Sequence, residues 1–254
     1  MKILSKPALK IVGIFALVAV AYYIGTQAPK TNIAIGADAD LKVAVKDVLI
    51  ENPAIIIAAF ENLKQHQEKV AQQAVEKELT PFLSSLKTDK NIVVAGNPNG
   101  DVTMVEFFDY QCGYCKRVVN DLVNVVEADG NIRLVLIDMP ILGDGSKLAA
   151  QYALAAEKQG KYMEFHTALM KSKGRLNDTM ILDIAKAVGG LDIEKLKADK
   201  DSEAIAARLD SNVQQARKLN INGTPAFIIG QEVAPGAITG QRMKEMVARA
   251  RKNS

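Results

Sequence analysis

The sequence predicts an α/β fold in which a helical subdomain is inserted into the middle of a sheet. Residues 102–108 and 132–137 are β-branched and apolar enough to form buried strands, and residues 113–128 between them have helical periodicity. A mostly helical region of about 146–220 then separates these elements from a short strand at 226–229. Strands that alternate with helices in this way are typical of α/β sheets.

The globular domain is predicted to span residues 91–254. A turn cluster at 97–101, Asn-Pro-Asn-Gly-Asp, precedes the first strand, and residues 241–252 form a closing helix. At 254 residues the chain has room for one such domain and an appendage. It contains no internal repeat and no low-complexity tract.

Composition excludes several classes of protein. A chain with 24% charged and 48% hydrophobic residues is neither disordered nor a protein with many membrane spans. The net charge of +3 is small and spread along the chain, which argues against a nucleic-acid partner. The two cysteines, Cys112 and Cys115, are only three residues apart, so the chain is not a disulfide-stapled scaffold.

The first 29 residues have the layout of an export signal, because three lysines precede an uncharged run that reaches residue 29. Residues 11–28 fit either a signal peptide that is cleaved after Ala28 or a retained anchor in the inner membrane. A further alternative is a buried helix of a soluble protein. Under the positive-inside rule the rest of the chain is exported, so we expect a protein of the periplasm or cell envelope.

Residues 30–90 are assigned to a helical oligomerisation segment. The stretch 41–86 contains no glycine and is predicted to be helical, with an interruption at Pro53 and an end near Pro81. Apolar residues in it have the alternating spacing of a coiled-coil seam, namely Ile56, Phe60, Leu63, Val70 and Ala74. We expect a homo-oligomer, a dimer or trimer, formed through residues 41–86. The alternative is an amphipathic helix that lies on its own domain.

Cys112 and Cys115 form the candidate reactive site. The first cysteine is predicted to lie at a helix N-terminus, where unpaired N–H groups and the helix dipole stabilise its thiolate. The second lies about one turn further, close enough to attack a mixed disulfide. Cys112 is therefore the predicted nucleophile and Cys115 the resolving thiol of a redox-active disulfide. Lys116 and Arg117 favour the thiolate if they lie near it, and otherwise face solvent.

A structural zinc site is disfavoured, because it needs four ligands and the chain has two cysteines and two histidines. His66 lies in the helical segment and is predicted to be solvated. His166 is predicted to be an ordinary residue of the helical insert. Neither a metal nor an organic cofactor is expected.

Two segments resemble the signatures of a known family. Residues 106–116, Glu-Phe-Phe-Asp-Tyr-Gln-Cys-Gly-Tyr-Cys-Lys, look like the active-site segment of the DsbA family, and residues 223–226, Gly-Thr-Pro-Ala, look like its cis-proline loop. The helices ahead of residue 92 resemble the oligomerising N-terminal region of the ScsC-like branch. The resemblance implies a thioredoxin-like fold with an inserted helical subdomain, acting on protein substrates that contain cysteines.

The resemblance also implies roles for individual residues. Pro225 is expected to be cis and to lie beside the dithiol, with the backbone of Thr224 free to pair with a substrate strand. Glu106 matches the buried acid of thioredoxin-like enzymes, which relays a proton to and from Cys115. The alternative is a carboxylate that faces solvent at the edge of a strand.

Gly113 and Tyr114, which are assigned to the substrate-binding surface, differ from the dipeptide of the strongly oxidising members, which contains a histidine. Without a side-chain cation to hold Cys112 as thiolate, the couple is expected to be less oxidising, and the dipeptide resembles that of DsbC-type isomerases. The predicted function is a disulfide isomerase or reductase of envelope proteins, reset by a membrane or periplasmic redox partner. The alternatives are a DsbA-like oxidase and a non-catalytic envelope binding or antigenic protein.

Overall fold

The computed structural model describes residues 38–89 and 91–253. The chain divides into two compact units, Met1–Lys64 and Gln65–Ser254. The predicted signal or anchor, residues 1–29, lies outside the described residues. Within the described ranges, no helix has both the length and the apolar character needed to cross a bilayer.

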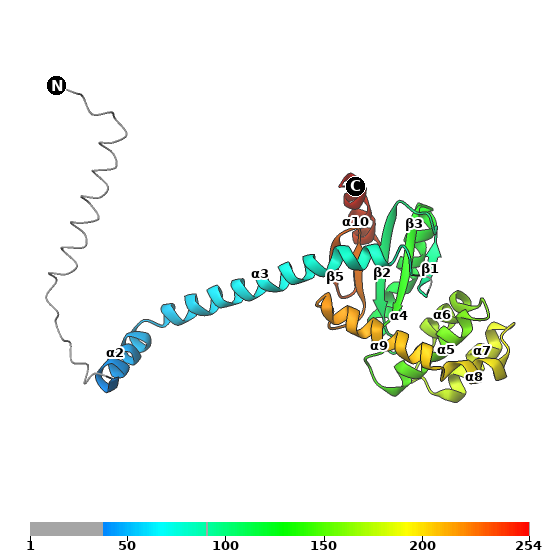
Figure 1. Cartoon of the computed structure of the whole chain (residues 1–254), viewed down its shortest axis with the longest axis horizontal. Coiled ribbons are helices and arrows are strands. Elements are labelled where there is room, and N and C mark those ends of the chain that lie inside the picture. Colours follow the sequence, from blue (N-terminus) through cyan, green and yellow to red (C-terminus); the bar gives the residue numbers. More distant parts are fainter. Residues whose placement is uncertain (1–37, 90, 254) are drawn as a thin grey trace, which may run out of the picture. The chain divides into compact units, whose positions relative to one another are not determined.

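The secondary structure elements follow one another as shown in Figure 1. They are α2 (Asp38–Glu51), α3 (Pro53–Ser85), β1 (Val93–Gly96), β2 (Val102–Phe108), α4 (Gly113–Asp129), β3 (Ile132–Asp138), α5 (Asp144–Glu157), α6 (Tyr162–Lys171), α7 (Asp178–Val188), α8 (Ile193–Lys200), α9 (Glu203–Lys218), β4 (Ala226–Ile229), β5 (Glu232–Pro235) and α10 (Gly240–Lys252).

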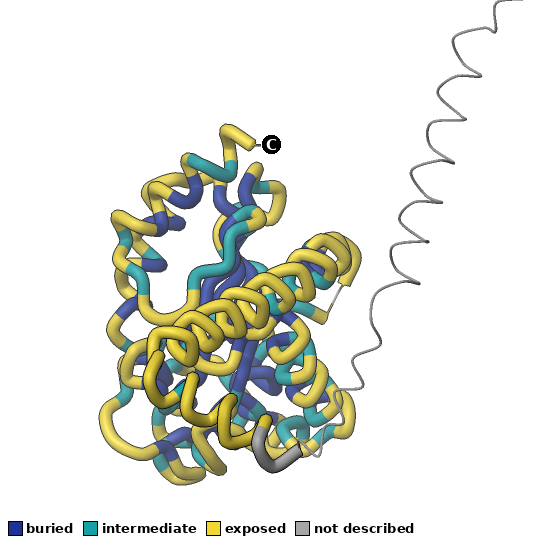
Figure 2. The backbone as a smooth tube through the Cα atoms, turned by 90° about the vertical axis from the view of Figure 1, so that its left-hand side faces the viewer, coloured by how far each residue is buried: buried dark blue, intermediate teal, exposed yellow. Residues whose placement is uncertain are grey.

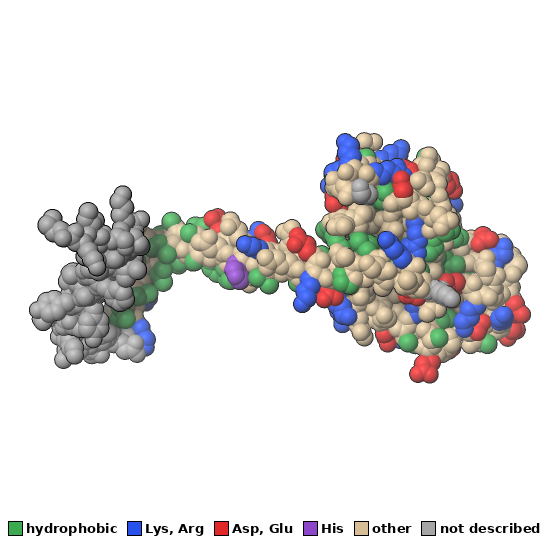
Figure 3. All heavy atoms as spheres, turned by 45° about the horizontal axis from the view of Figure 1, so that its top comes forward, with side chains coloured by type: hydrophobic (Ala, Val, Ile, Leu, Met, Phe, Trp, Pro, Cys, Tyr) green, Lys and Arg blue, Asp and Glu red, His purple; other side chains and the backbone are tan. Residues whose placement is uncertain are grey.

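Helix α2 and the first part of α3 carry many exposed apolar side chains. The interruption predicted at Pro53 is confirmed, since α2 ends at Glu51 and α3 begins with the proline, which is favourable at the first helical position. Phe60 is 67% exposed, and Figure 3 shows apolar side chains along α3. The other large exposed apolar residues here are Leu41, Val43, Val45, Val48, Ile50, Ile55, Ile56, Ile57 and Leu63.

The helix end predicted near Pro81 is wrong, because α3 continues through this proline to Ser85. A proline inside a helix costs about 3 kcal/mol. Here the two neighbouring apolar residues, Leu79 and Phe82, are buried against the sheet, and the Phe82 ring lies 6.0 Å from that of Phe107. This packing offsets the cost, so the last turns of the predicted helical segment belong to the core of the second unit.

Within the part of the chain that the structure describes, the second unit is built on a five-stranded sheet with the order β1-β3-β2-β4-β5. Strands β2 and β3 are parallel, and the other neighbours are antiparallel. The strands predicted at 102–108, 132–137 and 226–229 are confirmed. The sequence does not predict the edge strands β1 and β5, because each has four residues and is only partly buried, which leaves no long apolar run.

Both faces of the sheet are covered by helices. Met104 and Phe108 of β2 pack on one face with α4, α10 and the helical insert. Val105 and Phe107 pack on the other face with the end of α3 and with α9. A strand that is buried on both sides has no regular polar alternation, and in β2 only Thr103 and Glu106 are not apolar. Figure 2 shows the buried strands beneath the exposed outer surfaces of the helices.

The helical insert predicted for about 146–220 is confirmed, because α5, α6, α7, α8 and α9 all lie between β3 and β4 in the chain. Helix α5 packs with its neighbours α6, α8 and α9. Alanines fill much of its buried surface, which allows close approach of the surrounding helices; they are Ala149, Ala150, Ala153, Ala155 and Ala156.

We predict that Phe82→Ala lowers the free energy of unfolding of the second unit by about 3–5 kcal/mol, the usual cost of removing a buried phenylalanine. Phe82 is 6% exposed, whereas Phe60, on the same helix, is 67% exposed and serves as the matched control. Urea unfolding followed by the near-ultraviolet circular dichroism of the buried tyrosines measures both variants. Equal losses for Phe82→Ala and Phe60→Ala would contradict the assignment of the end of α3 to the core.

Candidate active site

The reactive cysteines lie where β2 leads into α4. Cys112 is the N-cap residue of α4, with extended backbone angles (φ −74°, ψ 113°), and its carbonyl accepts the N–H of Lys116 at 3.1 Å. Its own side chain makes no capping hydrogen bond. The sulfur belongs to the N-cap residue, where the positive end of the helix dipole stabilises a thiolate. Both cysteines are free thiols. The predicted position of Cys112 at a helix N-terminus is therefore confirmed.

The loop that precedes β4 lies directly against Cys112. The Thr224–Pro225 peptide bond is cis, and the Cys112 thiol donates a hydrogen bond of 3.2 Å to the Thr224 carbonyl. The pairing of β2 with β4, in which Phe107 lies opposite Ala226, brings together these segments that are 112 residues apart. The structure thus confirms the predicted cis bond and its place beside the dithiol, while the carbonyl of Thr224 already has a partner in the reduced protein.

Cys115 and Glu106 are both buried on the same side of the sheet. Cys115 has no exposed surface, and burial raises the pKa of its thiol well above the usual range. Glu106 is 1% exposed; burial, and next the nearby charge of Cys112, raise the pKa of its carboxyl to about 8. The alternative of a solvent-facing Glu106 is wrong. Both groups are therefore protonated at neutral pH, and Oε2 of Glu106 has no hydrogen-bond partner among the described residues.

In the described part of the chain, the cationic residues that follow Cys115 contact other groups than the Cys112 sulfur. Tyr114 is 59% exposed, and the Arg117 guanidinium lies over its ring at 4.2 Å. Lys116 donates instead to the carbonyl and hydroxyl of Ser172 in the insert, at 2.8 and 3.1 Å. A Cβ added to Gly113 would meet no atom within 4 Å, so the surface beside Cys112 is open.

Two residues that the sequence did not identify hold the active-site loop. One carboxylate oxygen of Asp109 accepts the N–H of Gln111 at 2.7 Å, and the other accepts the N–H groups of Ile141 and Leu142 at 2.8 and 3.0 Å. The side-chain oxygen of Gln111 accepts the N–H of Leu176 at 3.1 Å. Their only signal in the sequence is their position just before Cys112.

The loop is also tightly packed at Gly145, on the first turn of α5. A Cβ at this position would lie 2.6 Å from the Leu176 carbonyl oxygen and 3.3 Å from the Gln111 side chain. Only glycine leaves room at this position for the hydrogen bond from the Leu176 N–H to the Gln111 side chain. The insert therefore fixes the residue that immediately precedes the nucleophile.

A buried polar cluster lies behind the same loop, and His166 belongs to it. The Tyr110 hydroxyl lies 3.1 Å from Nδ1 of His166, and the Tyr162 hydroxyl donates to Asp138 at 3.0 Å. Burial lowers the pKa of His166 to about 3 and raises that of Asp138 to about 7. His166 lies on α6 of the helical insert, as predicted, and is a neutral side chain buried in the core, and His66 is exposed as predicted.

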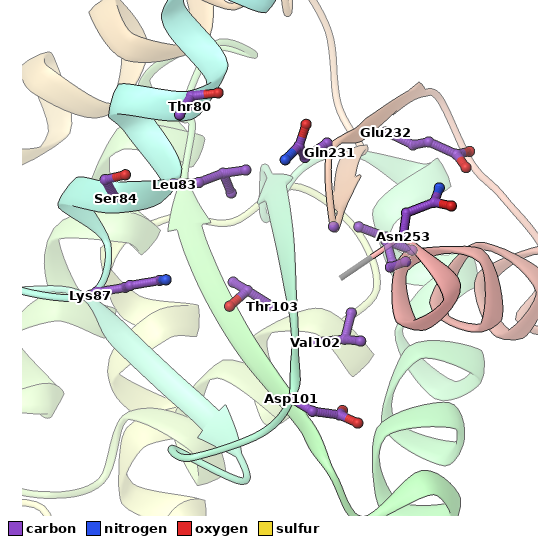
Figure 4. Close-up of a pocket in the computed structure, with 13 residues that line it drawn as sticks. Thr80, Leu83, Ser84, Lys87, Asp101, Val102, Thr103, Gln231, Glu232 and Asn253 are labelled. Carbon is purple, nitrogen blue, oxygen red and sulfur yellow. The ribbon is translucent and has the colours of Figure 1, made fainter.

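Elsewhere the described residues offer no second reactive centre. Among residues 38–89 and 91–253, no group of three His, Cys, Asp or Glu side chains is placed to hold a metal ion. A hollow of about 440 Å³ lies at the start of β2, lined by residues such as Thr80, Lys87 and Thr103 (Figure 4). Cys112 follows the opposite end of this strand, about 20 Å away at 3.3 Å per residue, so the hollow is remote from the dithiol.

A cysteine pair that opens a helix beside a cis-proline loop, on a mixed sheet with a helical insert, defines the class of thioredoxin-fold thiol-disulfide oxidoreductases. A family model described as thioredoxin matches residues 87–249. The chain belongs to this family, and within it to the DsbA-family thiol-disulfide oxidoreductases, as the two sequence signatures predicted.

Individual relatives cover different parts of the chain. Disulfide bond formation protein D from Bacillus subtilis (strain 168) is 27% identical over 168 residues, which cover 61% of this chain and 74% of that protein. A thioredoxin-like oxidoreductase from Silicibacter pomeroyi DSS-3 is 46% identical with a TM-score of 0.65, covering 67% of this chain and 98% of that one. ScsC from Proteus mirabilis in a transitional conformation is 27% identical with a TM-score of 0.64, covering 85% of this chain and 98% of that one.

The likeness to ScsC extends into the helical segment. The unit Gln65–Ser254 makes up 190 of the 254 residues, or 75%, so a match that covers 85% includes residues ahead of it. Part of the chain also matches proteins named Na(+)/H(+) antiporter NhaA, but it spans only 21% of the one from Salinispora arenicola (strain CNS-205).

We predict that iodoacetamide modifies Cys112 and leaves Cys115 unmodified in the reduced protein at mildly acidic pH. Cys112 lies at the helix start and is 5% exposed, whereas Cys115 has no exposed surface and its thiol resists ionisation. Peptide mapping by mass spectrometry after a short pulse measures the two sites. Equal labelling of both would contradict the assignment of nucleophile and resolving thiol.

We predict that Glu106→Gln stabilises the fold by an amount that grows as the pH rises from 4.5 to about 8. The pKa of Glu106 is raised in the folded protein. The stability that its protonated carboxyl contributes is therefore complete below pH 4.5 and is lost as the pH rises through the folded pKa of about 8. The amide does not titrate, so the difference grows by at most about 1.4 kcal/mol per pH unit.

Urea unfolding at several pH values tests this expectation. Glu127→Gln, at an exposed position of α4, is the matched control and should show no such trend. A difference between Glu106→Gln and the parent that is constant with pH would show that the carboxyl is ionised in the folded protein.

Proposed function

We propose that this protein is a disulfide isomerase or reductase of the cell envelope that acts through Cys112 and Cys115. The observation that carries the proposal is the direction of the cations in the first turn of α4. Lys116 is bound to Ser172 and Arg117 stacks on Tyr114, so neither contributes a contact to the Cys112 sulfur. With less stabilisation of the thiolate the reduced form is less favoured, and a weakly oxidising dithiol suits isomerisation and reduction.

In the proposed cycle the Cys112 thiolate attacks one sulfur of a wrong substrate disulfide. A bond forms between Cys112 and that sulfur, the substrate disulfide breaks, and the other substrate sulfur leaves as a thiolate. That thiolate can attack another substrate disulfide and so release the enzyme unchanged, which is isomerisation. Alternatively Cys115 attacks Cys112, which releases a reduced substrate and leaves the enzyme oxidised.

Glu106 supports the second route as a proton acceptor. Cys115 has to lose its proton before it attacks, and its burial makes the free thiolate costly. A carboxyl whose pKa is about 8 ionises in the range where it can take up that proton and return it. Thr224, Gly113 and Tyr114 form the surface that meets the substrate, since the last two are exposed beside the nucleophile.

The exposed apolar residues of α2 and α3 support a homo-oligomer. Side chains such as Ile56, Phe60 and Leu63 are between 41% and 67% exposed, and a contiguous apolar surface of this kind favours association with a second copy. Linking several dithiols raises the effective concentration for a second encounter with the same substrate. Export through residues 1–29 would place the assembly in the envelope, where a redox partner resets the dithiol.

The second candidate is a disulfide-donating oxidase. The helix dipole at Cys112 favours it, because the dipole stabilises the Cys112 thiolate that forms when the enzyme passes its disulfide to a substrate. The redox state of the two cysteines in intact cells separates the candidates. A largely reduced dithiol supports isomerase or reductase activity, and a largely oxidised one supports the oxidase.

We predict that residues 30–254 form an oligomer that refolds a scrambled disulfide substrate, and that residues 65–254 form a monomer that oxidises thiols but no longer isomerises. The truncation has to stop ahead of Leu79, Phe82 and Leu86, because these residues are buried in the core of the second unit. Sedimentation velocity and a refolding assay measure both proteins, with Cys112→Ser as the inactive control. A monomeric longer protein would refute the isomerase proposal and favour the oxidase.

A further inference from the structure

A groove beside the cis-proline loop is not used by the chemistry described so far. It has a volume of about 470 Å³ and lies within the second unit. Helix α3 contributes Glu68, Ala71, Gln72 and Val75 to its lining, and the apolar residues from the segments around the cis-proline loop and β5 include Ile221, Pro225, Val233 and Pro235. More than half of the lining residues are apolar, and its polar members are Glu68, Gln72, Asn220, Asn222 and Thr224.

The groove adjoins the reactive site at Thr224. Thr224 lines it, and the carbonyl of the same residue accepts the hydrogen bond of 3.2 Å from the Cys112 thiol. The loop is braced from the other side, because the N–H of Gly236, which follows β5, donates to the Pro225 carbonyl at 2.8 Å. A chain whose cysteine is bonded to Cys112 would therefore reach the groove with the residues next to that cysteine.

The dimensions fit a short extended segment. Ala71 and Val75 are four residues apart on a helix, a rise of about 6 Å. An extended chain advances about 3.3 Å per residue, so this wall faces about two consecutive residues. Side chains of an extended chain alternate in direction, which means that one of the two can enter the groove and the other faces away.

The groove lies on a different face of α3 from the predicted oligomer seam. Each helical residue turns the direction by about 100°, so Val75 is rotated by about 100° from Ala74, and Ala71 by about 100° from Val70 and about 60° from Ala74. Val70 is 51% exposed, whereas Ala71 and Val75 are only partly exposed. A second copy packed on the seam would lie beside Ala71 and would leave the Val75 side of the groove accessible to a substrate.

We propose that this groove binds the aliphatic side chain of a substrate residue within about three positions of the reactive cysteine, so that α3 forms part of the substrate-binding surface. The proposal rests on the proposed exchange with protein substrates, and it holds for either the isomerase or the oxidase direction. The occupant is an extended, unfolded segment, since a cysteine in a folded core presents no free neighbouring side chain.

The test uses the full exported chain with Cys115→Ser, which stops the reaction at the mixed disulfide. The probes are two peptides whose single cysteine is joined to thionitrobenzoate. One peptide has leucine, and the other serine, at the second residue on each side of that cysteine. Attack by Cys112 forms a bond to the peptide sulfur and breaks the peptide–thionitrobenzoate bond. The coloured thiolate that leaves reports the rate, with no net oxidation.

We expect the leucine peptide to react roughly tenfold faster than the serine peptide, the scale of burying one or two methylene groups. Ala71→Glu and Val75→Glu should reduce this ratio to near one, because each replaces an apolar contact in the groove with a carboxylate in addition to that of Glu68, which opposes burial of an aliphatic side chain. Val75→Ala, which adds no charge, should reduce it partly. Gln73→Glu is the matched control, since it adds the same charge at an exposed position of α3 outside the groove.

The small symmetric disulfide of thionitrobenzoate, which has no flanking residues, should react equally with every variant. A ratio near one in the parent, or a ratio that survives both groove substitutions, would overturn the proposal. So would loss of reactivity toward the small disulfide, which would show damage to the dithiol. Sedimentation gives the last criterion: a change of mass in Ala71→Glu and Val75→Glu, but not in Gln73→Glu, would assign the groove to contacts between copies. Failure to refold a scrambled substrate, with the peptide preference intact, would count only against isomerase function.

Discussion

The pairing of β2 with β4 is the constraint on which the site depends. Phe107 lies opposite Ala226, so the end of β2 and the beginning of β4 meet at one edge of the sheet. Cys112 follows the first strand and Thr224 precedes the second, which places the thiol 3.2 Å from the carbonyl. A register shift of one residue would turn every side chain of β4 to the opposite face. The two buried layers of the sheet therefore fix the geometry of the reactive site.

Burial then sets the chemistry. Glu106 and Cys115 lie in an environment where charge is costly, so each is protonated at neutral pH. A proton that passes from the thiol to a carboxylate leaves the total buried charge unchanged, whereas loss of a proton to water would add a charge. Under the proposed cycle, the molecules in which the Glu106 carboxyl is ionised therefore hold the least costly acceptor for the Cys115 proton. The neutral His166 and the hydrogen-bonded Asp138 extend this low-charge environment behind the loop.

The sequence predicts the parts of the fold that local patterns determine. Mostly apolar runs rich in β-branched and aromatic residues reveal β2 and β3, and the spacing of Cys112, Cys115 and the Thr-Pro motif reveals the reactive site. What it does not reveal depends on tertiary contacts. Helix α3 passes Pro81 because its flanking residues are buried, and the edge strands are too short and exposed to show a pattern. Asp109 and Gln111 hold the loop through backbone groups of distant segments, which leave no sequence pattern.

Helix α3 meets different environments along its length, and this determines how the helical segment relates to catalysis. Its last turns are part of the core through Phe82, its middle lines the groove through Ala71 and Val75, and its first part exposes residues such as Phe60. Core burial fixes the end of the helix, and an α-helix transmits position along its axis because each turn is hydrogen-bonded to the next. The groove wall next to the core is therefore held rigidly. The segment ahead of the thioredoxin fold is consequently not a single appendage: Leu79 and Phe82 belong to the core of the second unit, and under the proposed substrate binding Ala71 and Val75 contact residues next to the reactive cysteine.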